Sequence, residues 1–262
     1  MKNIINNHLK KIDKQEQKIL NKKGKNKIQE KINPLVEKME SKVPEALKET
    51  LKFTFYKAFQ LVFERGTKYI EKMYNKEKIQ LDHNMKDFLI NQKVNRKSIR
   101  AMDKHSKKSN VINASISTIE GAGLGLIGMG LPDIPLFTAM ILKTIYEIAL
   151  SYGFVYELHD EKIYVLRLIR GALTKGVIQS NHNALVDETA KYIDNHIKLD
   201  FDLNKEIEKT SEVLSEAMIT SKFVQGIPVV GVVGSITNFV VIKKISKYSS
   251  IKYKKRYLNK KM

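Results

Sequence analysis

The chain of 262 residues contains no cysteine and no tryptophan, and only five prolines. Without cysteine it has no disulfide scaffold, no thiolate metal site and no cysteine nucleophile. It also lacks the period-two alternation and hairpin turns that build a sheet. Because 42% of the residues are hydrophobic and 29% are charged, the composition is that of a folded chain. We therefore predict an all-α fold.

Acidic residues are scarce at both ends of the chain. The formal net charge is +19, and residues 1–110 carry 28 basic and 13 acidic side chains. Residues 241–262 carry nine basic side chains and no acidic one, whereas the middle of the chain is slightly acidic. We interpret residues 1–40 as a basic N-terminal extension. Residues 41–262 then form a helical domain that ends in a polybasic tail, 243–262.

The N-terminus lacks the apolar core of a signal peptide. Residues 1–31 are polar and basic, with sparse apolar positions, and a signal peptide needs an apolar stretch of about 7 to 15 residues. We therefore expect the chain to begin in the cytoplasm, and we expect this stretch to be a basic tail.

Apolar residues from Pro44 to Met73 recur every three or four positions, which indicates one long amphipathic helix. The polar sequence of 75–110 predicts a connector with one or two shorter helices. Next, Pro132 and Pro135 predict a tight turn, because a proline fits the first turn of a helix and disfavours helix in the residue before it. The predicted later helices begin with 111–130 and 135–152, which ends at Gly153. A further helix has Asp160 as its cap candidate and an apolar stripe from Leu166 to Val177, and two more have stripes running through Leu185–Ile197 and Ile207–Met218.

Two segments are apolar and rich in glycine. Between Gly121 and Leu142 the only charge is Asp133, and residues 223–242 carry none. About 20 apolar residues suffice to span a bilayer, and small residues four apart let helices approach closely. Prolines interrupt both runs, which favours a hairpin, 111–152, that packs against 223–242 and partly inserts into a membrane. Full spans and a tightly packed soluble core are the alternatives. The candidate contact residues are Gly121, Gly125, Gly128, Pro132, Asp133, Pro135, Gly231 and Gly234.

Basic residues directly follow the second apolar segment. Such a cluster gains about 1 kcal/mol per residue from an anionic cytoplasmic leaflet, and interleaved tyrosines suit the headgroup level. We therefore expect the tail to bind the inner face of the cell membrane, with a solubilising tail as the alternative. The polybasic candidates are Lys243, Lys244, Lys247, Lys252, Lys254, Lys255 and Arg256.

The chain offers no recognisable catalytic motif. Gly123–Gly128 matches G-x-G-x-x-G, but no strand precedes it and Pro132 interrupts the helix that should follow. No P-loop, H-E-x-x-H or G-x-S-x-G is present, and the six histidines do not have metal-ligand spacing. We therefore predict no catalytic residue, no metal, no cofactor and no enzymatic activity.

Four charged residues lie within apolar sequence: Asp133, Glu147, Arg167 and Arg170. A catalytic constellation is one interpretation of them. An ion-pair network that holds the helices together is the one we favour, since buried charges are normally paired. The basic net charge also permits a nucleic-acid-binding protein, although no recognised reader motif is present.

Six blocks of sequence carry a resemblance to a known family. They are, in order, Ala58–Lys72, Gly125–Pro135, Lys143–Phe154, Leu166–Leu173, Ile227–Gly234 with Asn238, and Arg256–Leu258. These blocks resemble the EcsC protein family over about residues 40–262, and residues 1–40 lie outside the pattern. The resemblance adds Asn238 to the candidate helix-packing or membrane-contact residues.

The resemblance implies a bacterial protein whose family is named after a gene beside those of an ABC transporter linked to secretion. It implies no enzymatic activity and no cofactor. The hairpin is also similar to helical hairpins that follow some membrane-associated GTPases, but this chain has no GTPase module. We expect an accessory of a transport or secretion system, bound to an anionic membrane surface and to a membrane protein such as an ABC transporter. A membrane-inserting toxin or pore-former is the alternative, followed by a nucleic-acid binder.

Overall fold

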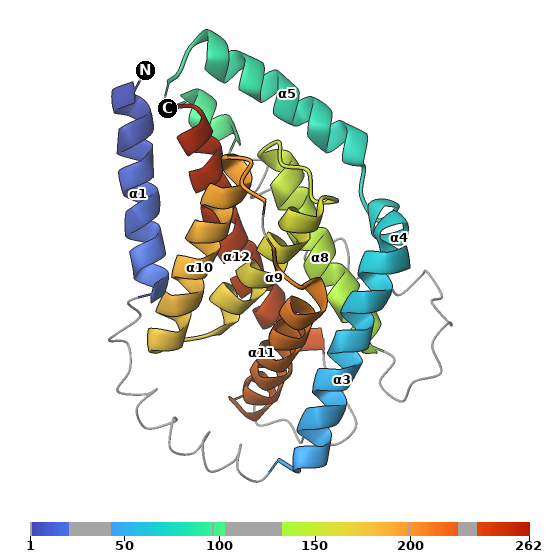
Figure 1. Ribbon diagram of the computed structural model, residues 1–262. Coiled ribbons are helices and arrows are strands. Elements are labelled where there is room, and N and C mark those ends of the chain that lie inside the picture. Colours follow the sequence, from blue (N-terminus) through green and yellow to red (C-terminus); the bar gives the residue numbers. More distant parts are fainter. Residues whose placement is uncertain (1, 21–42, 96, 103–132, 199, 225–234) are drawn as a thin grey trace.

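The computed structural model describes residues 2–20, 43–95, 97–102, 133–198, 200–224 and 235–262 (Figure 1). Within these ranges the chain forms helices and no strand, which confirms the all-α fold. The elements are α1 (Lys2–Leu20), α3 (Glu45–Leu61), a π-helical turn η1 (Val62–Gly66), α4 (Thr67–Glu71), α5 (Lys76–Gln92), α8 (Asp133–Ser151), α9 (His159–Leu173), α10 (Gly176–Asp194), α11 (Leu203–Val224) and α12 (Ser235–Lys260).

Helix α9 forms the centre of the bundle. Every residue from Ile163 to Leu173 is buried, and the helix packs against α10, α11 and α12. Helix α8 is similarly apolar and packs against α3, α5 and α12. Figure 1 shows the other helices arranged around these, with α1 on one side, α3 on the other and α5 lying across the top. Apolar residues on every side of α9 favour its central position, and its buried charged residues, Glu161, Arg167 and Arg170, are paired with side chains of other helices.

The long amphipathic helix predicted from Pro44 is present but contains a π-helical turn. Helix α3 runs into η1 and then into α4 without leaving the helical region. The Thr67 hydroxyl donates to the Val62 carbonyl oxygen, 3.3 Å away, across the widened turn. Phe55 and Phe59 on this face are fully buried, as the stripe predicted.

Gly153 terminates α8 as predicted, and the last helical residue is Ser151. The Phe154 N–H donates to the Ala149 carbonyl oxygen (2.9 Å) and the Gly153 N–H donates to that of Leu150 (3.0 Å), which is a Schellman motif. Gly153 has φ +77°, in the left-handed region, and the His83 imidazole occupies the space that a Cβ would need. Glycine is therefore required here for two reasons, backbone conformation and close approach.

We expect Gly153→Ala to lower the free energy of unfolding by about 2 kcal/mol, because it adds the clash with His83 to the backbone strain. Gly176→Ala is the matched control, since Gly176 also has a positive φ (+60°) but has open space around its Cβ position. That control should cost about 1 kcal/mol, the backbone term alone. Urea unfolding of the two variants measures the difference, and equal losses would show that His83 moves aside freely.

The N-terminal segment is part of the fold, which contradicts our interpretation of residues 1–40 as an extension. Helix α1 packs against α10 and α12 and buries Ile5 and Ile12 to 1% exposure. The sparse isoleucines suffice because they recur at helical spacing on the face that meets the bundle. Residues 21–40 lie outside the described ranges.

The buried face of α10 differs from the predicted apolar stripe. Leu185 is 38% exposed and Ile197, beyond the end of the helix, is 50% exposed. Gln179, Asn183 and Thr189 face the core instead. These polar side chains are buried because neighbouring helices supply hydrogen-bond partners, which a single-helix pattern does not reveal.

Candidate functional site

Helices α10 and α12 run parallel and in register. Ion pairs or hydrogen bonds join Asn183 to Tyr248, Asp187 to Lys252 and Asp194 to Arg256. The sequence separation is 65 residues in the first two pairs and 62 in the third. The N-terminus of α10 therefore lies at the same end of the bundle as that of α12.

The N-termini of α3 and α8 lie at this end as well. The ring centres of Phe154, just after α8, and Tyr253, near the carboxyl end of α12, are 5.3 Å apart, so α8 and α12 end together. The ring centres of Phe137, near the start of α8, and Phe55 of α3 are 6.3 Å apart, so α3 packs beside the start of α8. Figure 1 shows α8 and α12 both starting in the lower half of the molecule. We call this end, where α3, α8, α10 and α12 begin, the basal end.

Both apolar glycine-rich segments join the fold at the basal end. Residues 111–132 lead directly into α8 at Asp133, and residues 225–234 lead into α12 at Ser235. Pro135 is half-buried in the first turn of α8, where a proline is tolerated. For Asp133 and Asn238 only the helical backbone is described. The predicted residues Gly121, Gly125, Gly128, Pro132, Gly231 and Gly234 lie outside the described ranges.

The second arm of the predicted hairpin is a core helix. Helix α8 contains the single segment of the described chain, Ile134–Ser151, that is long and apolar enough to cross a membrane. Of that 18-residue window, 78% is buried inside the protein. Helix α8 packs against α12, which includes the end of the predicted partner segment 223–242; residues 225–234 of that segment lie outside the described ranges. The first arm, 111–130, lies outside the described part of the chain.

The polybasic segment is divided between surface and core. Lys243, Lys244 and Lys247 are exposed near the basal end. Lys252 and Arg256, however, are 1% and 3% exposed. The interpretation of 243–262 as a surface tail is therefore wrong for these two residues, because they lie on the face of α12 that packs into the bundle. Of the remaining candidates, Lys254 and Lys255 are half-buried.

The predicted ion-pair network exists around a different carboxylate. Arg167 and Arg170 both pair with Glu206 of α11, at 3.3 Å for Arg167 Nε, and Arg167 also donates to the Thr189 hydroxyl at 2.6 Å. Burial would raise the pKa of Glu206, but the two arginines outweigh it and lower that pKa. Burial lowers the pKa of Arg170, whose Nε and Nη1 have no hydrogen-bond partner among the described residues.

Glu147 belongs to a separate pair and not to the arginine network we predicted. It lies 3.2 Å from Lys143, one turn earlier on α8, and both are buried. Burial raises the pKa of Glu147 more than Lys143 lowers it. Helix α8 thus carries its own neutralising pair in the core.

A third buried carboxylate, Glu16, which the sequence analysis did not single out, holds α1 in place. Glu16 accepts hydrogen bonds from Lys252, from Lys255 (2.9 Å) and from the Asn183 amide (2.8 Å). Burial by itself would raise the pKa of Glu16, but the two lysines outweigh it and hold the pKa at about 2. Glu16 follows the buried Ile12 by four residues, and this helical spacing is the sequence signal that could have identified it as a residue of the buried face of α1.

Arg256 is the single arginine of α12, and its side chain is buried. It pairs with Glu161 of α9 (2.7 Å) and Asp194 of α10 (2.8 Å). Its charged carbon also lies 4.2 Å from the ring centre of Phe154 and 4.4 Å from that of Tyr164. The side chain therefore joins three helices through charge and cation–π contacts together.

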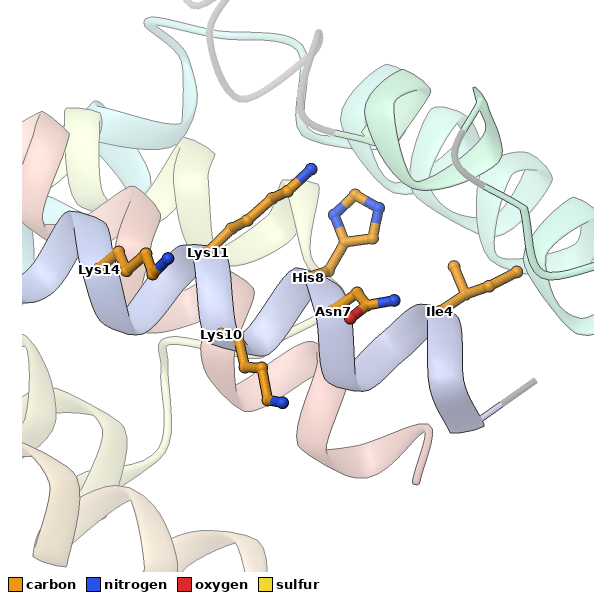
Figure 2. A pocket seen from close by; sticks show the side chains of 6 residues that line it. All are labelled: Ile4, Asn7, His8, Lys10, Lys11 and Lys14. Carbon is orange, nitrogen blue, oxygen red and sulfur yellow. The ribbon is translucent and has the colours of Figure 1, made fainter.

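A shallow basic hollow lies along α1. It has a volume of about 350 Å³ and is lined by Ile4, Asn7, His8, Lys10, Lys11 and Lys14, all from this one helix. Figure 2 shows His8 and Lys11 projecting to the same side of α1. Lysines on a single surface helix attract anions without selecting one, so we assign the hollow no ligand.

Charged groups of the described core are engaged in ion pairs, most of them between helices and one, Lys143–Glu147, within α8. No group of three or more His, Asp or Glu side chains in the described ranges is arranged to hold a metal ion. The feature that distinguishes the molecule is the basal end, with its apolar segments and exposed lysines.

Comparisons with known proteins give one result. The model of the EcsC protein family matches residues 6–258, which includes most of α1 and corrects our estimate that the resemblance starts near residue 40. Neither the curated proteins nor the solved structures contain a match. Since the family match covers nearly the whole chain, this protein belongs to the EcsC protein family.

Proposed function

We propose that the protein binds the cytoplasmic face of the bacterial cell membrane through its basal end. One observation carries the proposal: both apolar glycine-rich segments are joined to the bundle at the same end, at Asp133 and Ser235. Lysines exposed beside that end supply the second attachment. Durable membrane binding normally needs two such signals, one apolar and one electrostatic.

The exposed lysines favour an anionic leaflet. Lys243, Lys244 and Lys247 lie within the first three turns or so of α12, and each basic residue near an anionic surface contributes about 1 kcal/mol. No acidic residue occurs from residue 217 to the end of the chain. The attractive contribution comes from the exposed lysines at the start of α12, because Lys252 and Arg256 further along the helix are paired with carboxylates.

Sedimentation with anionic liposomes tests the proposal. We expect binding that weakens but persists as salt is raised, because salt screens the lysine contacts and leaves apolar contacts intact. Reversing three charges in K243E/K244E/K247E should weaken binding at low salt by at least 100-fold. The matched control K68E/K72E/K78E reverses three exposed lysines on α4, its end and α5, away from the basal end, and should change binding less than threefold.

Other outcomes would contradict the proposal. Absence of binding to anionic liposomes at low salt, together with tight and salt-sensitive binding to DNA or RNA, would indicate a nucleic-acid binder. Release of a trapped dye from the liposomes would instead indicate the pore-former, in which the apolar segments insert fully.

We also propose a non-enzymatic role as accessory to a transport or secretion system. Membership of the EcsC family and the absence of a catalytic motif from the sequence support it. A membrane protein such as an ABC transporter would meet the protein at the same leaflet. Comparing the secreted proteins of a strain lacking this chain with those of its parent tests this role, and an unchanged secretion profile would oppose it.

A further inference from the structure

Residues 175–178, which we call the α9–α10 turn, include the first three residues of α10 and present two large apolar side chains to solvent. Val177 is 77% exposed and Ile178 is 61% exposed. Gly176 before them has φ +60° and open space at its Cβ position. The Gln179 amide donates to the Gly171 carbonyl oxygen at 2.9 Å and ties the turn back to α9. The two side chains are therefore held outward on a fixed turn, at the lower end of α10 in Figure 1.

The surroundings of this turn are basic. Lys175, the first residue of the α9–α10 turn, is exposed. Because α10 and α12 pack in parallel, the turn lies at the same end of the bundle as the first turns of α12, where Lys243 is the first exposed lysine. The segments 162–186 and 217–262 contain no aspartate or glutamate. Carboxylates near the basal end occur on α3, where Glu45 is paired with Lys48 at 3.0 Å, and on α11, where Glu212 and Glu216 are exposed.

We infer that the α9–α10 turn, 175–178, enters the interface of an anionic bilayer as an apolar wedge. This inference rests on the proposed function and names the part of the described fold that reaches the lipid. Val177 and Ile178 would lie below the headgroups while Lys175 meets lipid phosphates, the usual arrangement of apolar and basic residues at a membrane surface. The turn is continuous with the basal end, where the two apolar segments also attach.

Charge complementarity and size point to lipid rather than to a protein partner. The two side chains form a far smaller patch than the 800 Å² or so per partner of a specific protein interface. An apolar pair surrounded by lysines, on segments without any carboxylate, matches an anionic lipid surface.

Helix α5 provides the matched comparison. Leu81, Met85, Phe88 and Leu89 are each about 60% exposed at helical spacing, so this helix has a larger apolar face than the turn. It lies across the opposite end of the bundle, where Asp87 bonds to Tyr257 and Lys261 near the end of α12. If exposed apolar area alone determined membrane binding, α5 would bind lipid first.

Vesicle partitioning of two double variants separates these surfaces. We expect V177D/I178D to bind anionic vesicles at least tenfold more weakly than the unmodified chain, because two buried apolar contacts are lost. The control M85D/F88D adds the same charge at equally exposed sites and should bind within twofold. Exposed positions tolerate these changes, and aspartate suits a helix N-terminus, so both variants should remain folded.

Each result has a distinct meaning. If the unmodified chain does not bind anionic vesicles, the proposed function fails. If it binds and V177D/I178D binds equally well, the wedge is refuted while the proposed function stands. A tenfold loss in M85D/F88D instead would place the membrane contact on α5 and would also refute the wedge.

The absence of tryptophan allows a direct check of insertion. In V177W the new side chain is the single tryptophan of the chain, and in M85W it is likewise the single one. We expect anionic vesicles to shift the emission of V177W to shorter wavelength and brominated lipids to quench it, with neither effect in M85W. An unchanged V177W spectrum on vesicle-bound protein would overturn the inference.

Discussion

Glu206→Ala should lower the free energy of unfolding by about 3–5 kcal/mol, one of the two largest effects we expect of a single substitution. It would leave Arg167 and Arg170 buried, at 4% and 2% exposure, without their shared carboxylate. Removing one partner of a buried ion pair strands an uncompensated charge, and that cost exceeds the net value of the pair. The lowered pKa of Glu206 reflects the same attraction.

Glu208→Ala is the control for that result, since Glu208 is exposed on the same helix and lies 3.5 Å from Lys52. A surface pair of this kind contributes about 0–1 kcal/mol. The double variant R170M/E206A should be more stable than E206A, because methionine removes one of the two stranded charges and fills the space. Chemical denaturation measures all three, and a loss below 1 kcal/mol for E206A would show that the arginines are already solvated.

The sequence predicted those features that depend on a single helix, namely the buried face of α3 and the termination of α8. The apolar spacing after Pro44 gave the α3 helix and its buried phenylalanines, and Gly153 gave the end of α8. Helical periodicity in α11 likewise places Glu206 on the buried face, one turn before the buried Thr210. Its arginine partners on α9 could not be identified, because pairing between helices depends on packing that no single helix encodes.

Charge density misled the sequence interpretation at both ends of the chain. In α12 the buried residues Tyr248, Lys252 and Arg256 follow one another at four-residue steps, so the helical period places two cations inside. They are tolerated there because acidic side chains of α1, α9 and α10 meet them. Those acidic residues lie far away in the sequence, so the basic residues of 243–262 by themselves predicted a solvent-exposed tail. The same reason applies to α1, because the partners of its Glu16 lie between 167 and 239 residues away.

Arg256→Ala should be comparably destabilising, by about 3–5 kcal/mol at neutral pH. It would leave the Glu161 carboxylate, 2% exposed, with no cation, and would remove the guanidinium from the rings of Phe154 and Tyr164. Lys260→Ala is the control, because Lys260 lies 3.1 Å from the same Asp194 but is half exposed. It should cost less than about 1 kcal/mol.

The pH dependence of the Arg256→Ala effect identifies its cause. Burial already raises the pKa of Glu161 above its ordinary value in the intact protein, with Arg256 opposing that rise. Without Arg256 the pKa of Glu161 in the folded state rises further, whereas its pKa in the unfolded chain stays near 4.5. Between these two values the folded variant binds a proton that the unfolded chain does not, so lowering the pH stabilises the variant. The stability difference between the variant and the unmodified protein should therefore shrink as the pH falls from 7 toward 4.5. Unfolding free energies across that range, with E161Q/R256A as the partly rescued variant, provide the measurement. A difference that stays constant with pH would assign the loss to packing around the guanidinium rather than to the stranded charge.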